Sequence, residues 1–389
     1  MDCIDSIIIG GGVSGLACGK TLHAHGRDFV LLTKDVGGRM LTSQSHVVNY
    51  GASYVTSDYE NVLPIMEGGN PIRTGECYFF REGRLINFFN LRTLRSSPAL
   101  FRLLFKVHDF RKRLKRLRHR ALHEQQKDIL ASDAVLSELV QTPAKVFVEK
   151  LGLEDLNELY FAPLFNSTGF IEYDQSNAFH YLDNLMPLLC RTYVADHSHC
   201  CERMSQGWDH RIRMEGVEEL IKADDDDGYF VRTESTTYRA QNVVLALPYK
   251  DAIRFWPVPE PDHNVPVYVI ELVGERRPNF RDKGIVFFSP KEHDIAILWK
   301  QVTGSDIIFS RIGEPALDKY YENHRIIRTI HWQTAVVLSG DEWVAQDLGN
   351  GIYLASDYNI CGLEDSFITG VYAANRIIAD AFQTRVQRS

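Results

Sequence analysis

The feature that most constrains the fold is a glycine-rich turn close to the N-terminus, Gly10-Gly11-Gly12-Val13-Ser14-Gly15. The β-branched run before it, residues 6–9, has the composition of a buried parallel strand. Small apolar residues at helical spacing follow it and end near Gly26, and a second apolar run occupies residues 29–32. This order of strand, turn, helix and strand predicts a βαβ unit that opens a parallel sheet.

Each glycine of the turn has a separate predicted role. Gly10 permits the tight turn, Gly12 lets a pyrophosphate approach the backbone, and Gly15 lets the helix lie close to the strand. The N–H groups of Val13 and Ser14 would open the helix and offer partial positive charge to phosphate oxygens. The turn therefore predicts a bound dinucleotide.

The segment after the second strand departs from the usual dinucleotide-binding pattern at one position and adds a second glycine element. An acid that binds the ribose hydroxyls is expected about 20 residues after the first glycine, yet this chain has Thr33 followed by Lys34. Asp35 lies two residues after Thr33 and is an alternative ribose ligand. The added element contains Gly38 and Arg39, where a second close backbone approach is combined with a countercharge for phosphate. Thr33, Lys34, Gly38 and Arg39 are therefore candidate cofactor-binding residues.

The overall composition excludes several classes of protein. The 389 residues are 44% hydrophobic and 24% charged, with a net charge of -8, which is typical of a globular chain of two or three domains and argues against a nucleic-acid binder. No apolar run reaches the roughly 18 residues needed to span a bilayer. The seven cysteines show no C-x-x-C pair, which favours reduced thiols in a cytoplasmic protein. We expect no metal site.

Further blocks of the chain extend the pattern beyond the first forty residues. Together with the opening turn they resemble the flavin-containing amine oxidase, phytoene desaturase and protoporphyrinogen oxidase superfamily. The resemblance covers about a third of the chain. The blocks are Val36-Gly37-Gly38-Arg39, Gly51-Ala52, a β-meander over residues 214–248 with a hairpin tip at residues 224–228, and a C-terminal strand and helix over residues 351–374.

The resemblance implies an α/β fold, in which a Rossmann-like FAD-binding domain carries an inserted substrate domain with a mixed sheet and a helical layer. The FAD-binding domain would be discontinuous and comprise residues 1–76, 203–258 and 347–389. Residues 77–202 and 259–346 would form the substrate domain.

The resemblance also implies a set of cofactor contacts outside the opening turn. The backbone of Val217 would face the adenine, and Asp357 would bond the ribityl or phosphate oxygens of the flavin. The N–H groups that open the last helix, at Glu364, Asp365 and Ser366, would face the carbonyl edge of the flavin ring.

The implied activity is FAD-dependent removal of hydride or electrons from a small to medium, largely apolar substrate, by desaturation, dehydrogenation or amine-type oxidation. Amine oxidases of the superfamily usually place a lysine near the flavin, on the strand that corresponds to residues 266–272. That strand has no lysine, which argues against a standard oxygen-using amine oxidase, and Lys300 lies on a neighbouring strand. The catalytic residue stays unassigned. Candidate pocket residues are Tyr268, Trp299, Lys300, Trp332 and Tyr358.

One basic segment, residues 102–120, departs from the acidic composition. It has nine Lys or Arg residues and an apolar face formed by Leu103, Val107, Phe110, Leu114 and Leu117. This pattern favours a helix that packs its apolar face on its own domain, and contact with a membrane surface or an acidic partner is the alternative.

Two functions other than an FAD-dependent oxidoreductase remain open. One is an NAD(P)-dependent dehydrogenase, and the other is a non-catalytic flavin-fold scaffold that uses the basic helix as its interface.

Overall fold

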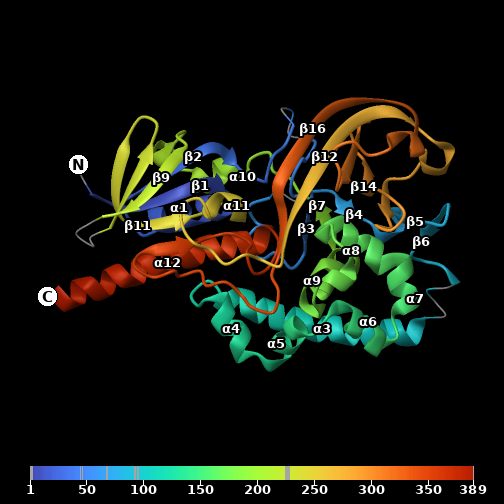
Figure 1. Ribbon diagram of the computed structural model, residues 1–389, viewed down its shortest axis with the longest axis horizontal. Helices are drawn as coiled ribbons and strands as arrows, with labels where there is room; N and C mark the ends of the chain where they lie inside the picture. Colours follow the sequence, from blue (N-terminus) through green and yellow to red (C-terminus); the bar gives the residue numbers. More distant parts are fainter. Residues whose placement is uncertain are drawn as a thin grey trace.

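A sheet assembled from three distant parts of the sequence forms one half of the molecule in the computed structural model, which describes residues 3–43, 45, 47–66, 69–91, 93, 96–223 and 228–388 (Figure 1). Strand β1 lies at its centre, with β2 on one side and β11 on the other, all parallel. The strand order is β8-β2-β1-β11-β10-β9, and β17 pairs with β11. The strands are β1 (Cys3–Gly12), β2 (Phe29–Gly37), β8 (Ile212–Arg213), β9 (Val217–Lys222), β10 (Tyr229–Thr233), β11 (Thr237–Leu245) and β17 (Ile352–Leu354).

Two helices cover one face of this first sheet. Helix α1 (Val13–Ala24) follows the glycine turn, and the long C-terminal helix α12 (Leu363–Arg388) packs against it. The contact is close, because a Cβ added to Gly370 of α12 would lie 2.0 Å from the carbonyl oxygen of Ser14. Side chains of β1 alternate between the faces: Ile8 joins the cluster under the helices, whereas Ile7 and Ile9 join a second cluster on the other face.

A second sheet of seven strands forms the other half of the molecule. Its order is β16-β12-β15-β14-β13-β5-β6, and β12 and β16 form the long curved arch seen in orange tones in Figure 1. All neighbouring pairs are antiparallel except β13 and β5. The strands are β5 (Cys77–Arg81), β6 (Arg84–Asn87), β12 (His263–Arg276), β13 (Ile285–Phe288), β14 (Ile295–Lys300), β15 (Asp306–Ser310) and β16 (Tyr321–Leu338).

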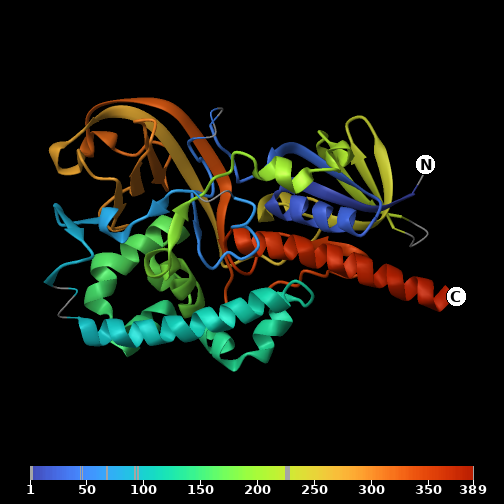
Figure 2. The same cartoon turned by 180° about the vertical axis from the view of Figure 1, so that it is seen from behind.

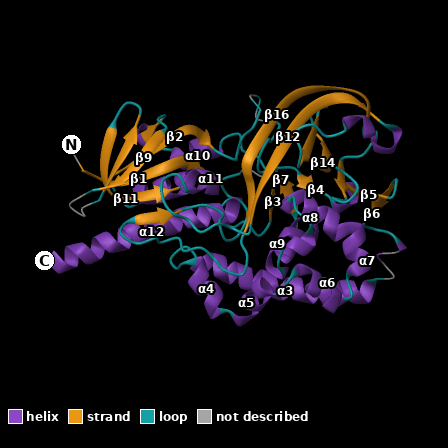
Figure 3. Cartoon of the chain, viewed as in Figure 1, coloured by secondary structure: helices purple, strands orange, loops and turns teal. Residues whose placement is uncertain are grey.

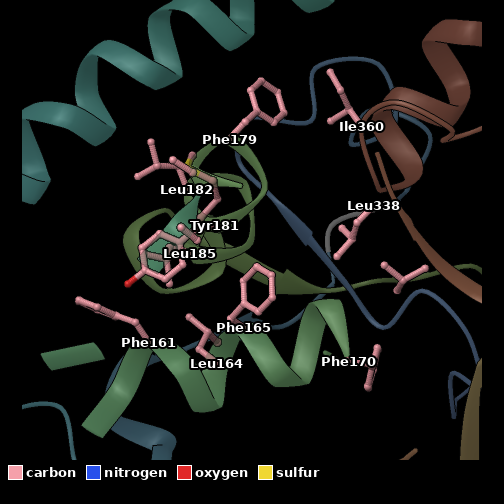
Figure 4. Packing of buried hydrophobic residues seen from close by; sticks show 14 of the residues in the cluster. Phe161, Leu164, Phe165, Phe170, Phe179, Tyr181, Leu182, Leu185, Leu338 and Ile360 are labelled. Carbon is pink, nitrogen blue, oxygen red and sulfur yellow. The ribbon is translucent and has the colours of Figure 1, made fainter. Parts of the chain in front are cut away.

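A layer of helices packs against the second sheet, as Figures 2 and 3 show. Its core joins residues from both layers; Phe165 and Tyr181 of the helices stack at 6.2 Å between ring centroids (Figure 4). Sheet residues such as Val267 and Phe309 belong to the same cluster. The helices are α3 (Ser97–Arg120), α4 (Gln126–Ser132), α5 (Ala134–Gln141), α6 (Ala144–Leu151), α7 (Glu154–Leu156), α8 (Ala162–Gly169) and α9 (Ala178–Leu189).

Small elements connect the two halves. Strands β3 (Tyr54–Thr56), β7 (Thr192–Val194) and β4 (Pro71–Ile72) form a three-stranded antiparallel sheet. Short helices α10 (Cys200–Ser205) and α11 (Tyr249–Ala252) lie beside the first sheet. None of the helices in the described ranges is long and apolar enough to cross a membrane.

These elements confirm the predicted α/β class and the Rossmann-like unit at the start of the chain. The strands predicted at residues 229–231 and 238–240 lie in β10 and β11, which pair antiparallel. Residues 224–227 of the hairpin tip predicted at residues 224–228 lie outside the described residues. The predicted basic helix is α3, and its apolar face, represented by Leu103 and Phe110, is buried in its own domain. The division into two domains stays a prediction, although the first sheet draws its strands from residues 3–37, 212–245 and 352–354.

Candidate cofactor and substrate site

The glycine turn owes its shape to two tight contacts. Gly10 has φ +112°, and a Cβ there would lie 2.2 Å from the carbonyl oxygen of Ala246 at the end of β11. A Cβ on Gly15 would lie 1.9 Å from the carbonyl oxygen of Gly10. Both positions therefore accept only glycine, because protein atoms already fill the space. Gly15 contacts the turn from behind and does not line the cavity, in agreement with its predicted role in helix packing.

Gly12 is different, because nothing in the protein requires a glycine there. Its backbone is extended, with φ -76° and ψ -176°, and an added Cβ would meet no protein atom within 4 Å. Gly38 faces it from the end of β2, with its Cβ position 3.1 Å from the Gly12 Cα atom. The two glycines line the same cavity. The space above Gly12 is therefore available to a ligand that approaches the backbone.

The hydroxyl of Thr33 supports the turn from the adjacent strand. Its Oγ1 accepts a hydrogen bond from the Gly11 N–H at 3.0 Å and donates one to the Asp35 carbonyl at 2.6 Å. The hydroxyl proton is thus used within the protein, so Thr33 can offer a ribose only a remaining lone pair. Asp35 and Lys34 line the cavity beside it.

The glycine turn lies at one end of a cavity of about 510 Å³, which extends between the two large sheets. Most of the predicted cofactor residues line it, and they come from β1, the start of α1, β2 and the residues after it, β9, the segment after β17 and the first turn of α12. These residues are Gly10, Gly12, Val13, Ser14, Thr33, Lys34, Gly38, Arg39, Val217, Asp357 and Ser366.

An ion pair on the wall of the cavity joins the two ends of the sequence. The guanidinium of Arg39 donates from Nη2 to Oδ1 of Asp357 and from Nη1 to the carbonyl of Ala335, the latter at 2.9 Å. The Asp357 carboxylate is 4% exposed and also accepts from the Ser356 hydroxyl at 3.0 Å. The carboxylate is therefore fixed on the cavity wall by charge-assisted hydrogen bonds.

The far part of the cavity is apolar. Alternate residues of β12, Val267 and Val269, point into it together with side chains from β13, β14, β15 and α8. Trp299 and Trp332 line it as predicted, and Trp332 donates its indole N–H to the Tyr50 carbonyl at 2.7 Å. The other apolar lining residues are Ile72, Leu164, Phe170, Pro187, Leu188, Ile285, Phe287, Ile297 and Phe309.

Three predicted pocket residues do not line the cavity. The ring of Tyr268 stacks on His331 with centroids 4.1 Å apart, because the alternation of β12 turns it to the opposite face from Val267. Lys300 is exposed at the end of β14. Tyr358 is buried and donates its hydroxyl to the Leu247 carbonyl at 2.8 Å. The prediction that these side chains form the pocket wall was wrong.

The first turn of α12 also differs from the prediction. The Glu364 carboxylate accepts hydrogen bonds from the Asn61 side chain at 2.6 Å, and the Asp365 carboxylate binds Arg118 at 2.6 Å, so neither side chain lines the cavity. Ser366 lines it, but its N–H donates to the Gly362 carbonyl at 3.0 Å and is not free for a ligand. A role for the N–H groups of residues 364 and 365 stays a prediction.

Sequence reasoning missed several polar residues of the cavity wall. The hydroxyl of Thr334 is buried and has no hydrogen-bond partner among the described residues. Glu215 accepts from the hydroxyl of Thr233 at 2.7 Å, and this hydrogen bond holds the pKa of the Glu215 carboxyl below its usual value. Lys250 and Arg254 also line the cavity, shortly after the predicted strand that ends at Pro248. Their position after a strand end is the only sequence signal that could have identified them as site residues.

A separate small pocket of about 50 Å³ adjoins the main cavity, and Tyr54 and Tyr59 line both. Asp183 lines this small pocket, with an oxygen 3.8 Å from the guanidinium of Arg118. The same guanidinium binds Asp365 through two nitrogen atoms. Burial raises the pKa of Asp183 to about 7. Within the described ranges, no group of three His, Cys, Asp or Glu residues could hold a metal ion.

The fold and the cavity together define a protein with a Rossmann-type sheet, in which the cavity at the glycine turn continues into an apolar chamber formed by the second sheet and α8. Residues 8–67 match the family model described as an NAD(P)-binding Rossmann-like domain. A search of curated protein sequences finds no match.

Solved structures extend this likeness to nearly the whole chain. A putrescine oxidase bound to putrescine matches with a TM-score of 0.66 and 15% identity, covering 98% of this chain and 99% of that one. Cyclohexylamine oxidase from Brevibacterium oxydans IH-35A gives 0.64 and 13%, covering 99% and 100%. A fatty acid isomerase from P. acnes that produces CLA gives 0.68 and 14%, covering 97% and 99%. The chain therefore shares its fold with these oxidase and isomerase structures, which agrees with the fold that the sequence resemblance implied.

Proposed function

We propose that the protein binds FAD and takes hydride or electrons from a small to medium, largely apolar molecule. The observation that carries this proposal is the open space above Gly12. A glycine that packing does not require lies opposite Gly38, at the helix N-terminus where a pyrophosphate binds in dinucleotide-binding folds. The solved oxidase and isomerase structures that share this fold also support a flavin cofactor.

The residues beyond the turn fit an extended dinucleotide. Arg39 supplies a cation and Asp357 a fixed acceptor on the cavity wall. The buried Thr334 hydroxyl, which lacks a partner among the described residues, adds a donor on the same wall. When bound, FAD would supply a flavin ring that accepts a hydride or electrons from the substrate.

The chain's own contribution is binding and exclusion of water. The walls formed by Val267, Val269 and Phe287 hold an apolar molecule and keep water away from it. Trp332 is fixed by its hydrogen bond to the Tyr50 carbonyl, so one aromatic face of the chamber has a set orientation. Lys34 and Lys250 are the lysines among the described lining residues, and neither belongs to the apolar part.

Photoreduction tests this function. The purified oxidised protein is mixed anaerobically with apolar amines, unsaturated fatty acids or other candidate substrates, and photoreduced protein is mixed separately with candidate electron acceptors. Substrate-dependent bleaching of the oxidised flavin bands, reoxidation of the photoreduced flavin by an acceptor, or a flavin-dependent double-bond shift supports the proposal. A flavin-loaded protein that turns over none of these classes would favour the scaffold alternative.

A nicotinamide-dependent dehydrogenase is the second candidate, because the matching family model is described as NAD(P)-binding. This candidate predicts a colourless protein whose activity follows absorbance of the reduced nicotinamide. A nicotinamide enzyme holds no flavin ring at the apolar end of the cavity. Its absorbance spectrum therefore lacks the visible flavin bands, and this difference distinguishes the two candidates.

A further inference from the structure

Helix α3 presents two apolar surfaces, and only one of them is covered. Its predicted apolar face packs into the core, where Leu103 is fully buried and Phe110 is 1% exposed. A second set, Phe101, Leu104 and Phe105, points to solvent with 62%, 42% and 75% of each residue exposed. The spacing of i, i+3 and i+4 places these three on one side of the helix.

Two further large apolar residues, which lie between β6 and α3 in the sequence, are also exposed. Phe89 and Leu91, just after β6, are 71% and 73% exposed. Figures 1 and 2 place the end of β6 and the start of α3 at the same end of the molecule. Isolated exposed apolar residues are normal, but five large ones within a 17-residue stretch of sequence require an explanation. We call Phe89, Leu91, Phe101, Leu104 and Phe105 the apolar patch.

Cations accompany the apolar patch along the same helix. Lys106 follows Phe105 directly, and Lys112 lies two turns farther on the patch side, since steps of seven and eight residues link Lys112 to Phe105 and Leu104. Both lysines are exposed, and neither forms an ion pair with a described residue. These free positive charges lie on a chain whose net charge is -8.

We propose that the apolar patch and its lysines dock the protein on an anionic lipid surface. Protruding aromatic and leucine side chains beside lysines on one helix are the elements by which interfacial helices enter the headgroup region. Charge complementarity selects the occupant, because the unpaired lysines of an acidic protein gain from a negatively charged membrane and gain nothing from a neutral one. The proposal does not depend on the cofactor or on the reaction.

Vesicle co-sedimentation tests the proposal with the full chain. Vesicles of phosphatidylcholine alone are compared with vesicles that contain about 30% phosphatidylglycerol. We expect binding to the anionic vesicles, reduced by added salt. The double variant Phe101→Ser/Phe105→Ser and the variant Lys106→Glu/Lys112→Glu should each weaken this binding by about tenfold or more. The matched control is Phe382→Ser, because Phe382 is 65% exposed on α12, at the other end of the molecule.

The outcomes separate lipid binding from other roles. Thermal unfolding should be unchanged in all these variants, since the substituted side chains are exposed. The proposal is overturned if the wild-type protein stays in the supernatant with anionic vesicles, or if it binds neutral vesicles equally well. It is also overturned if Phe101→Ser/Phe105→Ser changes the oligomeric state by gel filtration and leaves vesicle binding intact, which would mark a protein interface.

Discussion

Arg39 and Asp357 form a charge-assisted pair across 318 positions of the chain. Arg39 follows the second strand of the opening βαβ unit, and Asp357 follows β17 near the C-terminus. The pair lies on the wall of the main cavity, next to the groove that begins at Gly12. The groove exists only because the first and last parts of the sequence meet there.

Replacement of Asp357 by Asn should therefore reduce both stability and cofactor affinity. The change leaves the guanidinium of Arg39 without its carboxylate partner, and breaking such a partly buried pair costs about 3 kcal/mol. Chemical denaturation of the apoprotein measures this loss. Glu219→Gln is the matched control, because its pair with Arg232 is exposed and should contribute less than about 1 kcal/mol. Equal effects of the two variants would contradict the assigned role.

Gly12 and Gly15 should respond to alanine in opposite ways. Gly15→Ala places a methyl group 1.9 Å from the Gly10 carbonyl and should prevent folding of the turn, with little soluble protein recovered. Gly12→Ala meets no protein atom, so the apoprotein should unfold at the wild-type temperature while its flavin affinity falls by about tenfold or more. Recovery of soluble protein checks Gly15→Ala, and titration of the Gly12→Ala and wild-type apoproteins with FAD checks Gly12→Ala. A Gly12→Ala protein with normal flavin affinity would show that the space is not used by the cofactor.

Asp183 should make the protein less stable as pH rises. Its pKa is about 7 in the folded protein against an ordinary value of 3.8, so the folded state binds the proton more tightly and stability falls between about pH 4 and pH 7. Asp183→Asn removes this loss and should raise the unfolding free energy at pH 8 by an amount on the order of a few kcal/mol, with the gap closing near pH 4. Urea denaturation at both pH values measures the difference. A variant less stable than wild type at pH 8 would show that the pair with Arg118 outweighs the burial of the charge.

A bulky residue in the apolar chamber should separate substrate binding from flavin binding. Val269 lines the chamber from β12 and is fully buried. Val269→Phe reduces the space for the substrate, so KM should rise about tenfold or more while the flavin absorbance spectrum stays the same. Loss of flavin from this variant would place the ring, and not the substrate, against Val269.

The absence of a lysine from the described apolar lining predicts slow use of oxygen. Reduced protein should transfer electrons to a quinone or a ferricenium salt faster than to dissolved oxygen. Stopped-flow reoxidation of the photoreduced flavin compares the rates. Rapid formation of hydrogen peroxide would contradict this expectation and indicate that another group activates oxygen.

The parts of the fold and the site that depend on local sequence, such as glycine spacing and the periodicity of apolar residues, could be predicted. The glycine spacing and the apolar run at residues 29–32 predicted the βαβ unit that includes β2, and the strand expected at residues 266–272 is part of β12. The apolar periodicity of residues 102–120 identified the buried face of α3, and Trp299 and Trp332 line the cavity as expected.

The errors arose where side-chain direction depends on tertiary pairing. The strand containing Tyr268 was identified, but the face that this residue occupies follows from the pairing of β12 with β16. The carboxylates of Glu364 and Asp365 bind Asn61 and Arg118, which come from distant segments, so these side-chain partners could not be predicted from the local sequence. The open space at Gly12 and the exposed side of α3 also became visible only once the elements were packed.

The central claim is that an FAD molecule lies along the cavity from the glycine turn to the apolar chamber. The most direct test is to denature the purified protein and identify the released ligand by absorbance and mass spectrometry. The account predicts a yellow protein that releases FAD in an amount equimolar with the chain. Release of NAD(P), or of no nucleotide from protein that also fails to bind added FAD, would contradict it.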